Sequence, residues 1–272
     1  MKQIVIFLLA VISLTSATAQ TKKESRKVAS FNRISFSIPG VAYVRQGEEP
    51  GFEIEGPADF LAEVETEVND GRLSIRREGS WRIWQWRETQ SVRVWITVRN
   101  LEGLTVNGSG ELKAEGKWKL DDLKLNVNGS GSIEINAEAK GILSADLSGS
   151  GQIYVSGSCK SYDSDISGSG RITMNLNVYE KADFSITGSG KVEASGTAGI
   201  VHAHVSGSGR VLAFELETNK CEVDITGSGD VEISVKDVLN ASISGSGMVL
   251  YKGNPNHVNV KRLGSGKVQR MS

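Results

Sequence analysis

The sequence has no excess of charge of either sign. It carries 31 lysines and arginines against 32 aspartates and glutamates, a formal net charge of −1, and these residues are spread along the chain. Nucleic acids and anionic membranes attract proteins whose basic residues are clustered. We therefore expect neither a nucleic acid nor an anionic membrane surface among the partners of this protein.

Long hydrophobic runs are also scarce. The apolar run from Ile4 to Ile12 is too short to span a bilayer as a permanent helix. Lys2 precedes it and small residues follow it up to Ala19, which is the pattern of a cleavable signal peptide over residues 1–19. We expect an exported protein, in the periplasm or at the cell surface, whose mature chain has no transmembrane segment. The polar residues 20–30 predict a flexible N-terminus.

In place of these features the sequence has a repeated tripeptide. Gly-Ser-Gly occurs nine times between Gly108 and Gly266, at intervals of 18 to 21 residues. A valine, leucine or isoleucine stands two residues after every copy and two residues before each of the first eight. Regular spacing with apolar residues alternating at period two predicts stacked β-rungs. The expected fold is all-β, a single-stranded β-helix or β-solenoid with about 19–20 residues per rung.

The tripeptide is best explained as a corner of the rung. Its glycines can adopt a positive φ, and their missing side chains let successive corners stack closely. The residues that follow the tripeptides include four cations, which excludes a calcium-binding column because calcium needs oxygen ligands: Arg171, Lys191, Arg210 and Lys267. A phosphate-binding loop is excluded because strands rather than helices follow the glycines. We expect no cofactor.

The two cysteines lie three repeat units apart. Rungs stack about 4.8 Å apart, so Cys159 and Cys221 are separated by about 14 Å along the axis of the solenoid. The Cα atoms of a disulfide are rarely more than about 7 Å apart. The repeat therefore predicts two free, buried thiols.

The residues before the repeat predict strands that lack the Gly-Ser-Gly tripeptide. Residues 31–105 alternate polar and apolar side chains in several stretches, and Asn69-Asp70-Gly71 is a strong turn signal. Residues 57–65 predict a short helix with Pro57 near its start. Because no linker intervenes, we expect an N-terminal β region over residues 31–105 that continues into a repeat solenoid over residues 106–272.

Several short motifs precede the tripeptide series in a fixed order: Phe31 with Ile34, Gly40-Val41, Arg45-Gln46-Gly47, a helix containing Leu61, Asp70-Gly71 with Leu73, and Val98 with Asn100-Leu101. In this order, and followed by the repeats, they resemble the putative auto-transporter adhesin head GIN domain family, exported proteins common in Bacteroidetes. The resemblance covers about residues 31–251. It implies an all-β fold built largely of β-helical turns, and an adhesin role without a defined activity.

Two histidines are candidate metal ligands. His202 and His204 are two residues apart on one predicted strand, so they share a face and lie about 7 Å apart. Such a pair can bind zinc or copper with further ligands, and Asp183 and Glu222 occupy matching columns in the neighbouring units. An ordinary exposed face is the simpler explanation, and we assign no metal.

An enzyme of the polysaccharide-cleaving β-helix type would need acids on adjacent rungs of one face. Asp146 and Asp165 meet this condition, but Ser185 and His204 interrupt their column and alternation predicts that the column faces solvent. We therefore expect no catalytic site, and a polysaccharide-active enzyme is the less favoured alternative.

Tryptophans are concentrated in one stretch, with four of the five between Trp81 and Trp95. Exposed tryptophan beside arginine is typical of protein-binding hot spots and of platforms that stack on sugars. We name Arg82, Trp84, Trp86 and Trp95 as candidate ligand-binding residues; the alternative is that these rings cover an open end of the solenoid. The sequence thus favours a non-enzymatic, adhesin-like protein that binds a glycan or an envelope protein, with a purely structural, self-associating envelope protein as the alternative.

Overall fold

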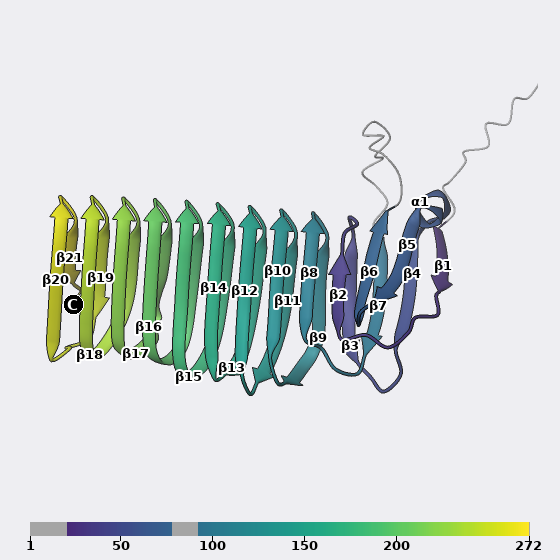
Figure 1. The fold of residues 1–272 in the computed structure, drawn as a ribbon, viewed down its shortest axis with the longest axis horizontal. Coiled ribbons are helices and arrows are strands. Elements are labelled where there is room, and N and C mark those ends of the chain that lie inside the picture. The colour runs from purple at the N-terminus through teal and green to yellow at the C-terminus, as the bar shows by residue number, and fades with distance from the viewer. Residues whose placement is uncertain (1–20, 78–91, 272) are drawn as a thin grey trace, which may run out of the picture.

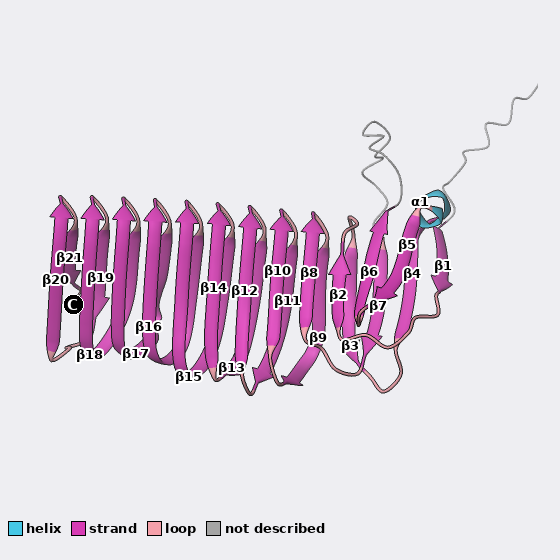
Figure 2. Cartoon of the chain, viewed as in Figure 1, coloured by secondary structure: helices cyan, strands magenta, loops and turns pink. Residues whose placement is uncertain are grey.

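The computed structural model describes residues 21–77 and 92–271, and these form an all-β solenoid with one short helix (Figure 1). The N-terminal part contains β1 (Thr21–Ser25), β2 (Arg33–Phe36), β3 (Val41–Gln46), β4 (Gly51–Pro57), α1 (Ala58–Ala62), β5 (Val64–Asn69), β6 (Arg72–Arg77) and β7 (Arg93–Val98). The helix lies at the N-terminal end of the stack (Figure 2).

The repeats form the strands that follow: β8 (Gly103–Gly108), β9 (Glu111–Leu120), β10 (Leu123–Gly129), β11 (Ser132–Ala139), β12 (Ile142–Gly149), β13 (Gln152–Cys159), β14 (Ser161–Gly168), β15 (Arg171–Gly188), β16 (Lys191–Gly207), β17 (Arg210–Gly227), β18 (Asp230–Gly245), β19 (Met248–Lys252), β20 (His257–Gly264) and β21 (Lys267–Arg270). A rung is one turn of this chain. Its leading side runs into the Gly-Ser-Gly corner and its trailing side runs out of it.

Successive rungs pair in parallel and in register. On the leading side Gly129 pairs with Gly149, and Gly149 with Gly168. On the trailing side Ile133 pairs with Ile153, and Ile153 with Ile172. Because the side chains of a strand alternate between its two faces, this register superimposes the apolar columns of the sequence and points them inward. The predicted β-solenoid is confirmed.

The core is a set of continuous apolar columns between the two sides. The residues two positions before the first eight tripeptides are each at most 2 % exposed: Val106, Val127, Leu147, Ile166, Ile186, Val205, Ile225 and Ile243. Complete burial of such a side chain contributes about 1.5–3 kcal/mol. Each rung alone has two apolar faces too small to form a core, so the rungs are stable only when they stack.

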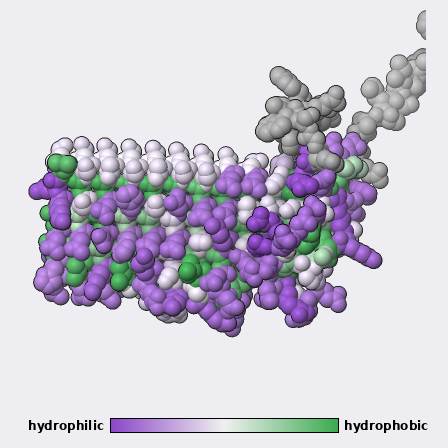
Figure 3. All heavy atoms as spheres, in the orientation of Figure 1, coloured by the Kyte–Doolittle hydropathy of each residue, from purple (hydrophilic) through white to green (hydrophobic). Residues whose placement is uncertain are grey.

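The two glycines of a corner are required for different reasons. The first glycine of every copy has a positive φ, for example +117° at Gly188, a conformation that L side chains rarely adopt. The second has no such φ, but a Cβ at Gly190 would lie 2.5 Å from the Ile166 side chain below it. The corners are also joined by hydrogen bonds, as where the Ser169 N–H donates to the Gly149 carbonyl at 2.9 Å. They form the pale band along one edge in Figure 3.

The parallel ladders continue into the N-terminal part. Strand β2 pairs with β6 and β8, and β3 pairs with β7 and β9, all in parallel. Outside them, β4 pairs antiparallel with β7, and β1 pairs antiparallel with β4. The segment 21–25, predicted to be flexible, is therefore a strand, because β4 offers it a free edge.

The helix prediction was too long. Helix α1 spans Ala58–Ala62 and follows Pro57, whereas Val64–Asn69 forms β5. Strand β5 pairs antiparallel with β6 across the turn at Asp70 and Gly71, both of which have a positive φ. The predicted turn is confirmed, and the hairpin formed around it prevails over the helical pattern because its ladder buries Val64 against the core.

Both cysteines are free and buried, as predicted. Among the described residues no helix is long and apolar enough to cross a membrane. The predicted signal peptide, residues 1–19, lies outside the described residues.

Candidate functional site

Of the four predicted binding residues, the structure places one. Arg82, Trp84 and Trp86 lie outside the described residues. Trp95 lies on β7 between buried Val94 and Ile96, and its own side chain is half-buried on the outer surface. Alternation along the strand therefore orients Trp95 away from the core.

Trp95 is stacked on a residue from a neighbouring strand. Its ring lies 6.3 Å from the ring of Tyr43 on β3, with 21° between the planes. Lys23 of β1 places its Nζ 4.4 Å from the centre of the Trp95 ring, within the range of a cation–π contact. Lys23 is itself paired with Glu53 at 2.9 Å. Three strands thus fix the orientation of this indole.

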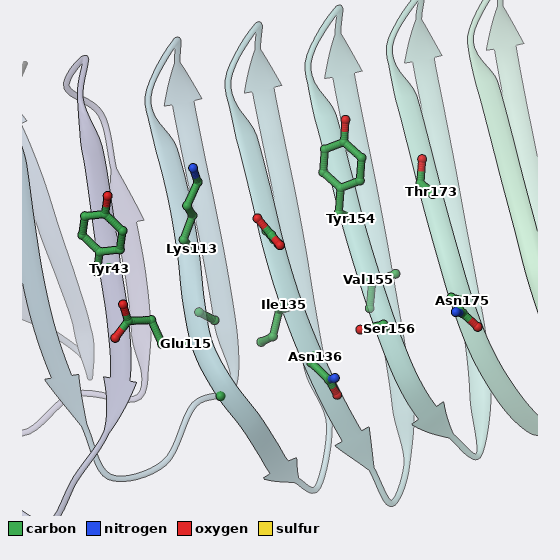
Figure 4. A pocket seen from close by; sticks show the side chains of 13 residues that line it. Tyr43, Lys113, Glu115, Ile135, Asn136, Tyr154, Val155, Ser156, Thr173 and Asn175 are labelled. Atoms are coloured by element: carbon green, nitrogen blue, oxygen red, sulfur yellow. The ribbon is translucent and has the colours of Figure 1, made fainter.

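The stack is one end of a row of side chains that crosses the trailing side. The strand register aligns six residues, which we call the aromatic row: Trp95, Tyr43, Lys113, Glu134, Tyr154 and Thr173. Figure 4 labels Tyr43, Lys113, Tyr154 and Thr173 of this row; the strand between those of Lys113 and Tyr154 is β11, which carries Glu134. Tyr43 and Tyr154 are three strands apart, about 14 Å at the usual strand spacing. Tyr154 is 39 % exposed, so its ring is available to a ligand.

A bulge opens a groove beside this row. Strand β9 inserts Ala114, Glu115 and Gly116 opposite the single residue Ile135 of β11. The φ of +79° at Gly116 allows the bulged chain to turn outward. The resulting groove has a volume of about 680 Å³ and reaches down to Ile135 and Val155.

The groove is lined by uncharged polar groups below the aromatic row. Asn136, Ser156 and Asn175 pair in register two residues farther along β11, β13 and β15. Their amides and hydroxyls can both donate and accept hydrogen bonds. Polar groups of this kind beside exposed aromatic rings can bind a ligand that is itself hydroxylated.

The cations next to the aromatic row are neutralised within the protein. Lys113 Nζ lies 3.1 Å from Glu111, and this hydrogen bond and ion pair raise the pKa of Lys113 above its ordinary value. Lys23 in the same way lowers the pKa of Glu53 below its usual range. Glu115 and Glu134 add negative charge to the groove. The site therefore does not favour a polyanionic ligand.

The candidate metal ligands lie on the leading side. His202 stands between Asp183 and Glu222, with contacts of 3.2 Å and 3.9 Å. His204 is in register with Ser185 and Asp224. This is the register expected from the sequence. Over residues 21–77 and 92–271, however, no group of three or more histidine, cysteine or acidic side chains is arranged to hold a metal ion.

The two candidate catalytic acids are adjacent and face outward, as expected. Asp146 and Asp165 are partners in the leading-side ladder. Asp146 is paired with Lys124 at 3.0 Å. The aromatic row lies on the other side of the rungs, so these acids are not part of the groove.

Sequence reasoning missed Tyr43 and Tyr154. Both stand at outward positions of predicted strands, but they are 111 residues apart, and only the stacking of β3 on β9 joins them in one row. The longest repeat interval, 21 residues from Gly108 to Gly129, was a signal of the bulge.

Comparisons with known proteins agree with this architecture. The family model described as "Putative auto-transporter adhesin, head GIN domain" matches residues 30–191 and 164–255. No curated protein matches the chain.

Three solved structures share the fold over almost the whole chain. A Parabacteroides distasonis protein described as a putative lipid binding protein has 22% identity and a TM-score of 0.68, over 94% of this chain and 98% of that one. Putative adhesins of Parabacteroides merdae and P. distasonis each have 21% identity, with TM-scores of 0.68 and 0.69. The first alignment covers 94% of this chain and the second 93%, and each covers 98% of the relative.

Proposed function

We propose that this chain, a member of the putative auto-transporter adhesin head GIN domain family, is an exported, non-enzymatic binding protein that attaches to an extended glycan through its aromatic row. The observation that carries the proposal is the alignment of Trp95, Tyr43 and Tyr154 in one register row beside an open groove. The family description supports adhesion, and the groove supplies a place for it.

The chemistry of the groove favours a neutral glycan. Sugar rings present apolar C–H faces that stack on aromatic side chains, and hydroxyl groups that pair with amides and hydroxyls. Tyr43 and Tyr154 supply the stacking surfaces, and Asn136, Ser156 and Asn175 supply the polar partners. The groove is open rather than enclosed, which suits a chain lying across several rungs better than a small molecule, since small ligands are mostly bound in deep pockets.

The proposal also states that the protein binds the glycan without cleaving it. Neither the family description nor those of the three solved relatives gives an enzymatic activity. The paired acids Asp146 and Asp165 lie on the opposite side of the rungs from the groove, and Asp146 is neutralised by Lys124. A bound glycan would therefore not reach them.

The test is a glycan array followed by calorimetry with the strongest neutral glycan. Tyr154→Ala should weaken binding about tenfold or more, because a stacked sugar is lost. Tyr179→Ala is the matched control, since Tyr179 is 73% exposed and lies outside the groove. Equal affinity of both variants and the wild type would contradict the proposal.

Two other outcomes would support different functions. A purely structural envelope protein would bind no glycan and would associate with itself in a concentration-dependent way. Because one solved relative is described as a putative lipid binding protein, neutral phospholipid vesicles belong in the same experiment. Binding to vesicles that is unchanged in Tyr154→Ala would favour a lipid ligand held elsewhere.

Export is part of the same proposal. The family is described as a putative auto-transporter adhesin, and this description supports a location outside the cytoplasm. Cleavage after Ala19 would leave Gln20 as the first residue, and N-terminal sequencing of the protein recovered from the envelope would test this. A cytoplasmic protein that retains residues 1–19 would argue against an adhesin.

A further inference from the structure

The edge formed by β20 and β21 is covered by no strand among residues 21–77 and 92–271. Strand β20 pairs with β18, and β21 pairs with β19, each along one side (Figure 1). Every residue of β20 is exposed, whereas one rung earlier the equivalent segment buries Leu239, Ala241 and Ile243. A strand with one unpaired side offers its free N–H and C=O groups to another strand.

Apolar side chains at this edge stand in the core columns. Val258 and Val260 are the register partners of Leu239 and Ala241, yet each is 40% exposed. A further strand with apolar side chains at alternate positions would cover them as each rung covers the next. Apolar burial and backbone hydrogen bonds would then act together, as in β-strand addition.

The same edge is strongly basic. It carries four cations, and no ion pair joins any of them to a described residue: Lys261, Arg262, Lys267 and Arg270. Arg262 takes the register position of buried Ile243. The printed sequence contains no aspartate or glutamate from Val238 onward, although the chain as a whole is nearly neutral.

This charge opposes pairing with a second copy. Two such edges would bring eight cations together, and like charges on paired strands are destabilising. At the opposite end of the stack the edge strand β1 carries Lys22 and Lys23, whose neighbouring acids Glu24 and Glu53 are already engaged in ion pairs with them. The acids beside β1 are therefore already paired within their own copy.

We propose that the β20–β21 edge is a docking site for an extended acidic segment of a different protein, in which apolar and acidic residues alternate. The segment would add one more strand to the solenoid. Its apolar side chains would cover Val258 and Val260, and its carboxylates would pair with Lys261, which faces outward on the same strand. The proposal is independent of the glycan site, which lies several rungs away.

The experiment measures the binding of labelled peptides to the full chain by fluorescence anisotropy. The probe is an eight-residue peptide of alternating valine and glutamate, matched in length to β20. Matched peptides replace glutamate with glutamine or with lysine, and another replaces the central valines with proline to remove N–H donors. We expect the glutamate peptide to bind about tenfold tighter than the glutamine peptide, and the proline peptide not to bind.

Charge reversal on the protein tests the location. The variant Lys261→Glu should lose about tenfold in affinity for the glutamate peptide and gain affinity for the lysine peptide. Lys119→Glu, at an exposed cation of β9, is the matched control and should bind like the wild type. Equal binding of the glutamate and glutamine peptides, unchanged affinity of the Lys261→Glu variant, or stable self-association of the chain through this edge would each overturn the proposal.

Discussion

His202 Nδ1 lies 3.2 Å from Asp183 Oδ1 on the neighbouring rung. The contact belongs to a ladder of titratable side chains in register across four rungs: Asp163, Asp183, His202 and Glu222. Lys181 also contacts Asp183, at 2.7 Å. Desolvation first, and then the hydrogen bond and charge of Asp183, raise the pKa of Asp163 above its ordinary value.

This ladder predicts a pH-dependent stability. An acid whose pKa is raised on folding binds more protons in the folded than in the unfolded state, so stability falls as the pH rises through the folded pKa. Asp163→Asn removes this effect and can still donate a hydrogen bond to Asp183. We expect a higher Tm than wild type at about pH 7 and no difference at about pH 3, measured by thermal unfolding.

The control for this prediction is Asp165→Asn, which removes an exposed carboxylate two residues along the same strand. It should not reproduce the pH-dependent gain. A lower Tm for Asp163→Asn at neutral pH would show that the carboxylate of Asp163 stabilises the fold.

The corner glycines predict a graded series of alanine variants. At Gly108 only the positive φ of +98° opposes a side chain, because nothing lies within 4 Å of the added Cβ. At Gly190 the φ is ordinary, and the Ile166 side chain at 2.5 Å and the Gly170 carbonyl at 3.1 Å oppose the added Cβ; at Gly188 the positive φ combines with a carbonyl 2.7 Å away. We expect Gly108→Ala to cost about 1–2 kcal/mol and Gly188→Ala about 3 kcal/mol or more, measured by urea unfolding.

The reason for the series is that strain and steric overlap add at Gly188. Equal losses at Gly108 and Gly188 would mean that the φ requirement alone accounts for the first glycine. A neutral Gly190→Ala would mean that the Ile166 side chain yields without cost.

The two thiols should be unreactive in the folded protein. Desolvation by burial is the main cause that raises the pKa of Cys159 and of Cys221 to about 12. Since the thiolate is the reactive form, the reactive fraction at about pH 8 falls roughly a thousandfold below that of an ordinary cysteine. A thiol reagent should label neither cysteine in the native protein and both after unfolding. A peptide linking Cys159 to Cys221 by a disulfide would contradict the register of the rungs.

The tryptophan pair outside the described residues gives the last prediction. If Trp84 and Trp86 belong to a binding patch, replacing both with alanine should leave the Tm nearly unchanged and weaken binding of the glycan or envelope protein. Trp118→Ala is the contrasting variant, because Trp118 is buried and its loss should cost about 3–5 kcal/mol. Global unfolding of the Trp84 and Trp86 variant would instead support a cap over the solenoid.

The repeat part could be predicted closely from the sequence. Column by column, the apolar residues flanking the tripeptides predicted which side chains are buried and that Cys159 and Cys221 are too far apart to be bridged. The N-terminal part was harder. Residues 57–65 combine a helix start at Pro57 with the beginning of a strand that pairs with β6. Residues 21–25 have no strand pattern in their sequence, and they form a strand because the edge of β4 is available for pairing.

The candidate site, too, could be predicted from the sequence only in part. Trp95 could be placed on the outer surface by alternation within its own strand. The row that unites it with Tyr43 and Tyr154 depends on strands that pair across long stretches of sequence, and the groove depends on the bulge at Gly116.

By itself, the sequence determined the shape of the rung, because the φ preference of glycine and the two-residue period of a strand act within a few residues. The tertiary structure alone decided which outward side chains share a face. That depends on the register between distant strands, which is set by packing of the whole stack.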